Sequence, residues 1–477
     1  MESKKPCPRS LSRRGFLLGA GAGLAAGVPA GILGYREADS RGWFTDAKVV
    51  STQTKPVSEF AMPGPYPGRV IEVYHPEAVN PKHEIDRPTV KKMMDAGMRE
   101  LTGADHPSEA WKRFFQPDDV IGIKVNPVGG SRGRHDVVEV ISNKEVVLET
   151  VRNLRAVGVP GKNIILFDRY AREFVDTGYA NLLTEREMDG VRWYCSAAAY
   201  TNEQIAINGV EDPSDFSPEL LRQVVGYDPD CFVHMGFAAT EHDPKDDRRF
   251  RSHLSAIVTR MVNKMITLPV LKDHRSSGVT LALKNMSHGM NNNVARSHLV
   301  NIVHGYPDSP SRNLVGPNQC NTFIPAAVNQ PILKDKATLH ILDGLIGVFE
   351  GGPGNWNKTW GTWRANSLFF ATDPVALDHI GWDIIDNKRL EQGLHRVGEM
   401  GRHMFTPARK AAMALGGLRA TTVADAMTLL ASEKFIRGGG DTEVLDRRQP
   451  EHVILAGLIG LGNFNLDKIL HRKIKLA

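Results

Sequence analysis

Alternating strand and helix patterns dominate the middle of the chain. Residues 120–125 form a short run of β-branched and apolar side chains, which is typical of a buried strand. Residues 143–157 repeat apolar side chains at helical spacing before a glycine, and residues 163–167 form a second apolar run. Because a strand, a helix and a strand joined over this distance form a right-handed βαβ unit, the two strands are predicted to be parallel.

The same alternation appears on both sides of this unit. Strands are predicted at 69–74, 264–270, 338–342 and 367–370, and helices at 89–101, at 107–115 and from Asp373-Pro374 onward. Pro269 indicates the end or the edge of its strand. The pattern predicts an α/β fold with a mostly parallel sheet, flanking helices and insertions.

Residues 1–35 have the composition of a bacterial export signal. Arg13 and Arg14 precede Phe16 and Leu17, and an uncharged run rich in Gly, Ala and Leu follows. The paired arginines resemble the twin-arginine type, an address read by the twin-arginine translocase. We therefore predict a periplasmic or extracytoplasmic location. If the segment were not cleaved it would tether the protein, because about 20 uncharged residues can span a bilayer.

The positive charge of the chain is concentrated in that segment. The 477 residues carry a formal net charge of +5, and the first 30 residues hold five Lys or Arg side chains against one Glu. The remainder is nearly neutral and lacks the clustered positive charge that nucleic-acid binding requires, so a nucleic-acid partner is not expected.

Composition also divides the chain into regions. Residues 36–67 are polar and rich in proline and are predicted to be a linker. Residues 68–389 hold the alternating elements and form the predicted α/β core domain. Residues 390–477 are more polar and irregular and are predicted to be an extension packed on the core.

The cysteines do not form an iron–sulfur motif. Cys7 lies in the signal, and Cys195, Cys231 and Cys320 are separated by spacings that match no CxxC pattern. They are predicted to be small buried apolar side chains, with at most one disulfide among them. The cofactor, if there is one, is not identified by the sequence.

The densest polar segment of the chain covers residues 271–298. Thr280, Lys284 and His288 are four residues apart, so on a helix they share one face and would present a hydroxyl, an ammonium and an imidazole to one ligand. This combination suits a carboxylate or phosphate ligand, or proton transfer beside one. The alternative is a polar surface loop. A divalent metal, for instance between His274 and Asp343 or Asp378, is a competing use of the histidines.

Other polar residues follow the predicted strands. In open parallel sheets, ligands bind outside the carboxyl ends of the strands. Side chains in such positions are Asn126, Asp168, Lys272, Asp343 and Asp373. The glycine-containing loop after Lys124 could hold an anion on its backbone amides.

A tryptophan cluster allows two interpretations. Trp356, Trp360 and Trp363 lie close together in the sequence. They either stack on a planar or sugar ligand or pack together as a loop.

Taken together, these motifs resemble the domain of unknown function 362 family, in its form with a twin-arginine signal. The resemblance covers about residues 118–385. The segments that carry it are Ile123-Lys-Val-Asn-Pro127, Phe167-Asp168, Lys272-Asp-His274, Val279-Thr-Leu-Ala-Leu-Lys-Asn285, Asp343-Gly344, Gly351-Gly-Pro353, Thr372-Asp-Pro-Val-Ala-Leu-Asp378 and, more weakly, Gly460-Leu-Gly462.

The resemblance makes a redox partner one expectation, but this chain is not expected to hold an iron–sulfur cluster of its own. Members are often fused to, or encoded beside, ferredoxin-type iron–sulfur modules, but this chain has no cysteine cluster. The polar positions that recur in the family correspond here to Lys124, Asn126, Asp168, Lys272, His274, Thr280, Lys284, Asn285, Asp343, Asp373 and Asp378.

We therefore expect an exported enzyme that binds an anionic or polar small molecule or cofactor at the strand ends, with oxidoreductase as one candidate class. The expected catalytic residues are Lys272, His274, Lys284, Asp343 and Asp378. The expected ligand-binding residues are Lys124, Asn126, Asp168, Thr280, Asn285, His288, Arg296, His298 and Asp373. The alternatives are a non-catalytic periplasmic ligand- or cofactor-binding protein and a subunit of a redox complex.

Overall fold

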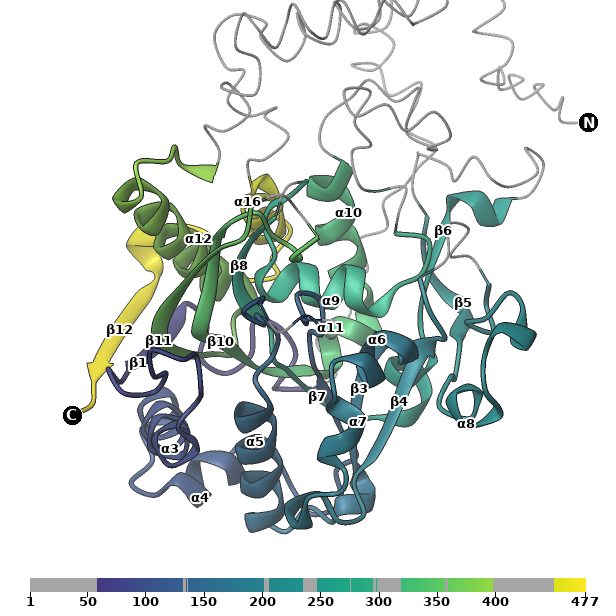
Figure 1. Cartoon of the computed structure of the whole chain (residues 1–477), viewed down its shortest axis with the longest axis horizontal. Helices are drawn as coiled ribbons and strands as arrows, with labels where there is room; N and C mark the ends of the chain where they lie inside the picture. The colour runs from purple at the N-terminus through teal and green to yellow at the C-terminus, as the bar shows by residue number, and fades with distance from the viewer. Residues whose placement is uncertain are drawn as a thin grey trace, which may run out of the picture. The chain divides into compact units, whose positions relative to one another are not determined.

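Most of the predicted core domain can be followed in space in a computed structural model (Figure 1). The structure describes residues 58–131, 134, 136–200, 206–234, 247–274, 276–294, 297, 319–356, 359–397 and 450–477. These residues lie within one compact unit that spans residues 56–477. The predicted export signal and the first part of the predicted linker are outside the described residues.

A mixed sheet forms the centre of the described part of the chain. Its strands run in the order β12-β1-β11-β10-β7-β2-β3-β4, and β8 pairs with both β10 and β9. The pairs β12–β1, β10–β7, β7–β2, β2–β3, β3–β4 and β10–β8 are parallel, which confirms the α/β fold with a mostly parallel sheet. The strands of this sheet are β1 (Arg69–Tyr74), β2 (Ile121–Lys124), β3 (Ile164–Tyr170), β4 (Arg192–Ala197), β7 (Lys264–Thr267), β8 (Val270–His274), β9 (Gly278–Val279), β10 (Ala337–Glu350), β11 (Gly361–Ala371) and β12 (Leu470–Lys475).

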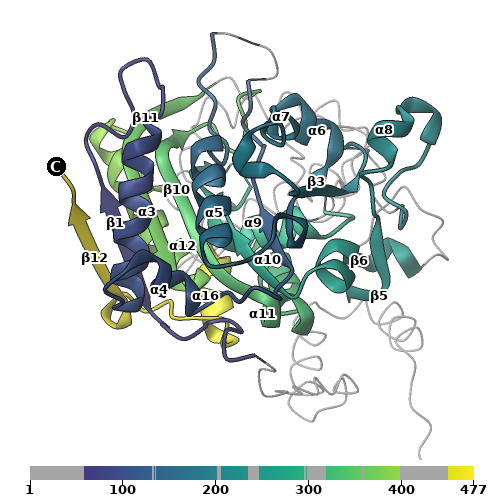
Figure 2. The same ribbon diagram turned by 90° about the horizontal axis from the view of Figure 1, so that it is seen from below.

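A smaller antiparallel sheet pairs β5 (Tyr227–His234) with β6 (Arg251–Ser255). Helices cover both faces of the main sheet, with α3, α4 and α5 on one face and α9, α10, α12 and α16 on the other (Figures 1 and 2). The helices are α3 (Arg87–Thr102), α4 (Pro107–Lys112), α5 (Lys144–Ala156), α6 (Ala171–Asp176), α7 (Tyr179–Leu182), α8 (Pro218–Leu221), α9 (Leu281–Met290), α10 (Gln319–Val328), α11 (Pro331–Lys336), α12 (Pro374–Glu391) and α16 (Glu451–Leu458).

A central strand of the main sheet such as β3 contributes to two hydrophobic cores. In β3, Ile164 and Leu166 pack into the core beneath α3 and α5, whereas Ile165 and Phe167 pack into the core beneath α9 and α10. Successive side chains of a strand point to opposite faces, so a strand that is covered on both sides is apolar throughout. This explains the continuous apolar runs in the sequence.

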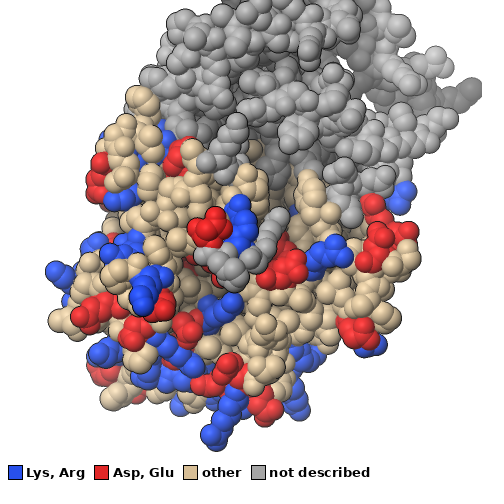
Figure 3. All heavy atoms as spheres, in the orientation of Figure 1, with Lys and Arg blue, Asp and Glu red and all other residues tan. Residues whose placement is uncertain are grey.

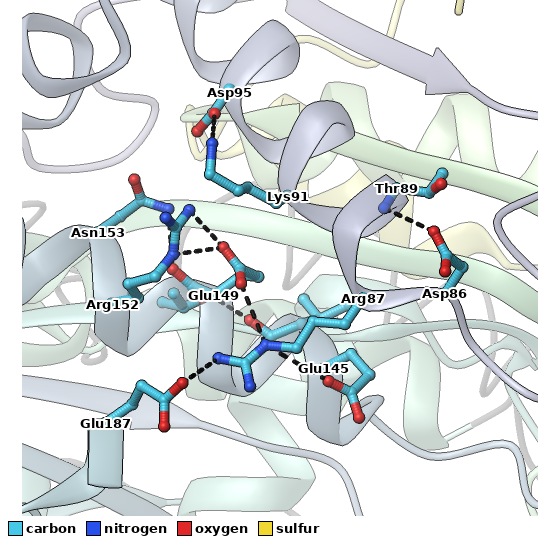
Figure 4. A network of polar contacts seen from close by, with 12 residues as sticks. Asp86, Arg87, Thr89, Lys91, Asp95, Glu145, Glu149, Arg152, Asn153 and Glu187 are labelled. Atoms are coloured by element: carbon cyan, nitrogen blue, oxygen red, sulfur yellow. Dashed lines mark hydrogen bonds and ion pairs between the residues drawn. The ribbon is translucent and has the colours of Figure 1, made fainter. Parts of the chain in front are cut away.

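An ion-pair network fixes α3 against α5 (Figure 4). The guanidinium of Arg87 contacts Glu149 of α5 at 3.2 Å and Glu187 at 2.9 Å, and Arg152 also binds Glu149. Asp86 accepts a hydrogen bond from the backbone amide of Thr89 and so caps the start of α3. The network therefore joins the start of α3 to α5 and to the segment that holds Glu187.

Several predicted elements differ in length from the observed ones. The predicted strand 163–167 continues to Tyr170, and the predicted strand 264–270 is divided into β7 and β8 around Pro269. The predicted strands 338–342 and 367–370 belong to the longer hairpin strands β10 and β11. Hydrogen bonds to partner strands, which local periodicity does not reveal, set these lengths.

Both ends of the described chain pack on the core. Residues 58–67, assigned above to a linker, lie against it: Met62 is buried and its amide donates to Lys334 O at 3.0 Å. At the other end, α16 packs on α10 and α12, and β12 extends the sheet beside β1. In the described part of the C-terminal region, α16 therefore packs on the helices of the core and β12 extends the sheet.

The remaining observations concern the cysteines, the apolar character of the helices and the surface charge. Cys195, Cys231 and Cys320 form no disulfide with one another. A search of the described residues finds no helix with the length and apolar character needed to span a membrane. On the face drawn in Figure 3, the basic and acidic side chains of the described residues are interspersed.

Candidate functional site

A cavity of about 780 Å³ opens at the carboxyl ends of β2, β3 and β8, and α9 forms one of its walls. This volume is in the range of small-molecule and cofactor sites. The residues that line it are Lys124, Asn126, Val128, Asp168, Arg169, Tyr170, Arg172, Glu173, Asp176, Ala199, Tyr200, His274, Ser276, Thr280, Lys284, Asn285, His288, Gly289, Val294, Pro353 and Trp356.

Lys124, the last residue of β2, organises the floor of the cavity. Its buried ammonium donates to Asp168 Oδ1 at 2.5 Å, to Asn285 Oδ1 at 3.2 Å and to its neighbouring carbonyl, Val125 O, at 2.7 Å. A Cβ on Gly289 would lie 2.7 Å from Lys124 Nζ. A side chain at position 289 would therefore require the Lys124 ammonium to move from its hydrogen bonds.

Asn285 and Asn126 each accept a hydrogen bond from a lysine through the side-chain oxygen, so the side-chain nitrogen points elsewhere. An ammonium group can only donate, so the amide atom that faces Lys124 must be the oxygen of Asn285. The amide nitrogen of Asn285 is then left buried without a hydrogen-bond partner in the described structure. In the same way, Asn126 Oδ1 accepts from Lys272 Nζ at 3.3 Å and from the amide of Val128 at 3.1 Å, which leaves its amide nitrogen as a donor.

Lys272 lies behind the cavity wall. Its side chain is fully buried and donates to Asn126 and to the carbonyl of Val128. Burial lowers the pKa of Lys272 to about 7, against the opposing fields of Glu173, Asp168 and Asp273. The structure thus places Lys272 as a support for Asn126 and not on the cavity surface.

The helical face predicted from the sequence lines the cavity. Thr280, Lys284 and His288 all contribute to its wall. The pKa of Lys284 is lowered to about 8, mainly by burial, with Cys320 opposing the shift and the nearby guanidinium of Arg169 adding to it. An amine in this range exchanges protons near neutral pH.

His274 is held in one tautomer. Its Nδ1 accepts hydrogen bonds from the backbone amides of Ser276 at 3.0 Å and Ser277 at 3.2 Å. Because backbone amides only donate, Nδ1 carries the lone pair and the proton of the neutral ring is on Nε2. In this tautomer His274 can donate a hydrogen bond from Nε2, and its expected role in proton transfer stays a prediction.

His288 is built into the wall. Its Nδ1 lies 3.0 Å from Ser287 Oγ and its Nε2 lies 2.8 Å from Ser297 Oγ, and its ring packs edge-on against Phe323. Arg296 and His298, which were also expected to bind the ligand, lie outside the described residues.

Three predicted carboxylates do not line the cavity. Asp378 accepts hydrogen bonds from the amides of Ala282 and Leu283, at 2.7 and 2.9 Å, and so caps the start of α9. Its burial raises its pKa well above the ordinary value. The expected catalytic role of Asp378 is thus replaced by a positioning role for the helix that carries Lys284.

Asp343 and Asp373 also hold backbone amides. Asp343 accepts from the amides of Asn143 at 2.6 Å and Leu345 at 3.1 Å, and burial raises its pKa to about 6. Asp373 caps α12 and also accepts from the amides of Gly68 and Asn463. Neither carboxylate lines the cavity beside His274, and in the described residues no group of three His, Cys, Asp or Glu side chains is placed to hold a metal ion.

The end of β3 supplies cavity residues that the sequence analysis missed. Arg169 is buried, donates to the carbonyl of His288 and to the hydroxyl of Tyr227, both at 3.3 Å, and so ties β3 to α9. Tyr170 lines the cavity, and its buried hydroxyl has no partner in the described structure. The strand-end rule would have found both residues if the strand had been extended beyond Asp168.

Two backbone amides of the loop after β2 already have acceptors within the loop. The amides of Val128 and Gly130 donate to Asn126 Oδ1 and Pro127 O, so both are used within the loop. Among the tryptophans, Trp360 donates to Val138 O at 3.0 Å and Trp363 packs on Phe349. Trp356 is the member of the cluster that lines the cavity.

The fold and the site define an α/β protein with a buried, donor-rich cavity at its strand ends. Residues 235–383 match the family described as Domain of unknown function (DUF362). No curated protein matches the chain. The matched segment carries Lys272, His274 and Lys284, whereas Lys124 and Asp168 precede it.

Proposed function

We propose that the cavity binds an anionic small molecule. The observation that carries this proposal is an excess of buried positive charge. In the described residues of the cavity and its floor, the buried cations are Lys124, Arg169, Lys272 and Lys284, and the buried carboxylates are Asp168 and Asp273.

Charge and hydrogen bonding favour the same ligand. Burying charge costs several kcal/mol per ion, so an anion that enters a site with more buried cations than buried carboxylates recovers part of this cost. The amide nitrogens of Asn285 and Asn126 and Nε2 of His274 are donors, which suit the oxygens of a carboxylate, phosphate or sulfonate. Arg172, Glu173 and Asp176 add charges of both signs to the cavity lining.

We further propose that the protein is an enzyme and that Lys284 exchanges a proton with the bound molecule. Its lowered pKa, about 8, leaves a useful fraction of neutral amine near neutral pH. The donors of His274 and Asn285 would stabilise negative charge that develops on an oxygen of the substrate. In this proposal Lys272 and Lys124 position the donors and do not react.

A binding assay tests the anion site. Inorganic sulfate and benzenesulfonate keep a fixed charge between pH 6 and 9, and their affinities can be measured by calorimetry. Lys284→Met should lower the affinity for each of these two anions about tenfold, because it removes one charge-assisted hydrogen bond. Lys336→Met is the matched control, because Lys336 is also a lysine with a pKa lowered by burial, donates to Val258 O at 2.7 Å and does not line the cavity.

Equal affinities in the wild-type protein and Lys284→Met would contradict the anion site. A test of catalysis follows by mass spectrometry of molecules released from natively purified protein. The released molecule, returned to the protein in D₂O, should gain deuterium with the wild-type protein and not with Lys284→Met.

A non-catalytic binding protein is the second candidate. It is favoured by the positions of Asp343 and Asp378, which hold backbone amides instead of facing the cavity. Tight retention of the released molecule without exchange or turnover would select this candidate, and co-purifying redox subunits would instead indicate a place in an electron-transfer complex.

We also propose that the protein is exported by the twin-arginine translocase. The support is the sequence Arg13-Arg14 followed by an uncharged run. Fractionation of cells that express the full chain should find it outside the cytoplasm.

A further inference from the structure

We infer that the ligand consists of two parts, an acidic group held at the cavity floor and a flat aromatic ring held at the cavity mouth. The inference rests on the proposed anion site and extends it to the rest of the molecule that binds there. It would make aromatic carboxylates, phosphates or sulfonates the ligand class.

Two exposed aromatic side chains line the cavity. Trp356 is 53% exposed and Tyr200 is 62% exposed, and both belong to the lining. They come from different parts of the fold, since Tyr200 follows β4 and Trp356 lies between β10 and β11. Large aromatic side chains exposed at a cavity commonly mark a binding surface.

Trp356 is exposed and yet held in place. A Cβ built on Gly354 would lie 2.0 Å from the indole, so the ring rests directly on the bare backbone of that glycine. The loop is also tied down at two points: the amide of Gly352 donates to Asp273 Oδ1 at 2.6 Å, and Asn355 Nδ2 donates to Gly130 O at 2.7 Å. A ring presented on such a loop loses little conformational entropy when a ligand stacks on it.

Tyr200 forms part of a second aromatic wall. It meets Tyr170 edge-on, with ring centroids 5.9 Å apart and an angle of 77° between the rings. The guanidinium of Arg169 lies 4.8 Å from the centre of the Tyr170 ring. The wall therefore joins an aromatic surface at the mouth to a buried cation at the floor.

The size and polarity of the cavity favour this ligand over smaller or more polar ones. One water occupies about 30 Å³ of liquid, so a compact anion would leave most of the 780 Å³ unfilled. A sugar donates as many hydrogen bonds as it accepts, whereas the identified groups at the floor are mainly donors. An aromatic acid uses the donors at one end and the rings at the other.

Three sulfonates test the inference, since they carry the same charge and differ in the attached group. Naphthalene-2-sulfonate has a flat ring, cyclohexanemethanesulfonate has an apolar group that is not flat, and methanesulfonate has neither. Naphthalene-2-sulfonate should bind at least tenfold more tightly than each of the others, because stacking on one aromatic side chain contributes about this factor.

Substitutions at the mouth should separate stacking from charge. Trp356→Leu and Tyr200→Leu should each weaken naphthalene-2-sulfonate by about tenfold and leave methanesulfonate unchanged. Gly354→Ala, which displaces the indole without removing it, should act like Trp356→Leu. Trp363→Leu is the control, because this indole comes from the same hairpin and packs on Phe349.

The outcomes distinguish this inference from the proposed function. If none of the three sulfonates binds, the anion site itself is refuted. If methanesulfonate binds in a manner that depends on Lys284, the anion site holds. The ring inference is then overturned by equal affinity for the flat and non-flat probes, or by unchanged affinity in both Trp356→Leu and Tyr200→Leu.

Discussion

The affinity of the cavity for an anion should fall as the pH rises from 7 to 9. Lys284 faces the cavity and its pKa is about 8, because burial and the guanidinium of Arg169 both disfavour its charged form. His452 also lies close enough for Lys284 to lower its pKa, and Cys320 acts on Lys284 in the opposite direction. The perturbation is therefore the removal of one proton from one ammonium group at the binding surface.

The size of the effect follows from the pKa. With a pKa of about 8, roughly 90% of Lys284 is charged at pH 7 and roughly 10% at pH 9. If the neutral amine binds a fixed-charge anion about tenfold more weakly, as expected for Lys284→Met, the affinity should fall about fivefold. Lys272, with a pKa of about 7, is already losing its charge at the start of this range and adds to the decline. An anion that binds the charged form raises the pKa of Lys284, so binding at pH 8 should take up protons.

Calorimetry with benzenesulfonate at pH 6, 7, 8 and 9 measures the affinity, and two buffers of different ionisation enthalpy measure the proton uptake. Lys284→Met should bind weakly and lose most of the step between pH 7 and 9, whereas Lys336→Met should keep it. An affinity that does not change between pH 6 and 9, or a full step that persists in Lys284→Met, would refute the reasoning.

Lys272 and Lys284 also affect the stability of the protein without ligand. Their effect on the free energy of unfolding has the opposite sign to their effect on anion affinity: it rises with pH. Both have folded-state pKa values below the ordinary 10.5, so between about pH 7 and 10.5 the unfolded chain binds more protons than the folded one. Their contribution to the free energy of unfolding therefore rises with pH in this window.

Three further changes test the supporting structure. Asp378→Ala should lower the free energy of unfolding by about 2–4 kcal/mol in urea titrations, because it leaves two buried amides of α9 without acceptors; a loss below 0.5 kcal/mol would show that the cap is dispensable. Gly289→Ala should weaken sulfonate binding severalfold, because the new methyl group collides with Lys124, and unchanged binding would contradict that contact. Replacement of both Arg13 and Arg14 by lysine should keep the protein in the cytoplasmic fraction, and normal export would exclude the twin-arginine route.

The positions of the cavity residues were only partly predictable. The four-residue spacing of Thr280, Lys284 and His288 was sufficient to place them on one side of a helix, because helix geometry is local. The end of β3 was placed too early, at Asp168, because the pairing of Tyr170 with Ala197 on the neighbouring strand extends it. The cavity residues Arg169 and Tyr170 were missed for this reason.

The carboxylates show the limit of reasoning from position alone. Asp378 and Asp168 were both expected at the site, yet one caps α9 and the other faces the cavity beside Lys124. A buried carboxylate can neutralise either the amides of a helix start or an ammonium group, and the residue type is the same in both cases. Which partner it meets depends on how the layers pack.

The sequence by itself determined the alternation of strands and helices, the parallel βαβ unit and the helical face that carries Lys284, since each depends on periodicity within a single segment. Only the tertiary structure decided which polar groups share one cavity, that His274 presents Nε2 as a donor and that Trp356 is the exposed indole. These properties arise from contacts between segments far apart in the chain, such as Gly352 with Asp273. Such contacts cannot be predicted from the periodicity of a single segment.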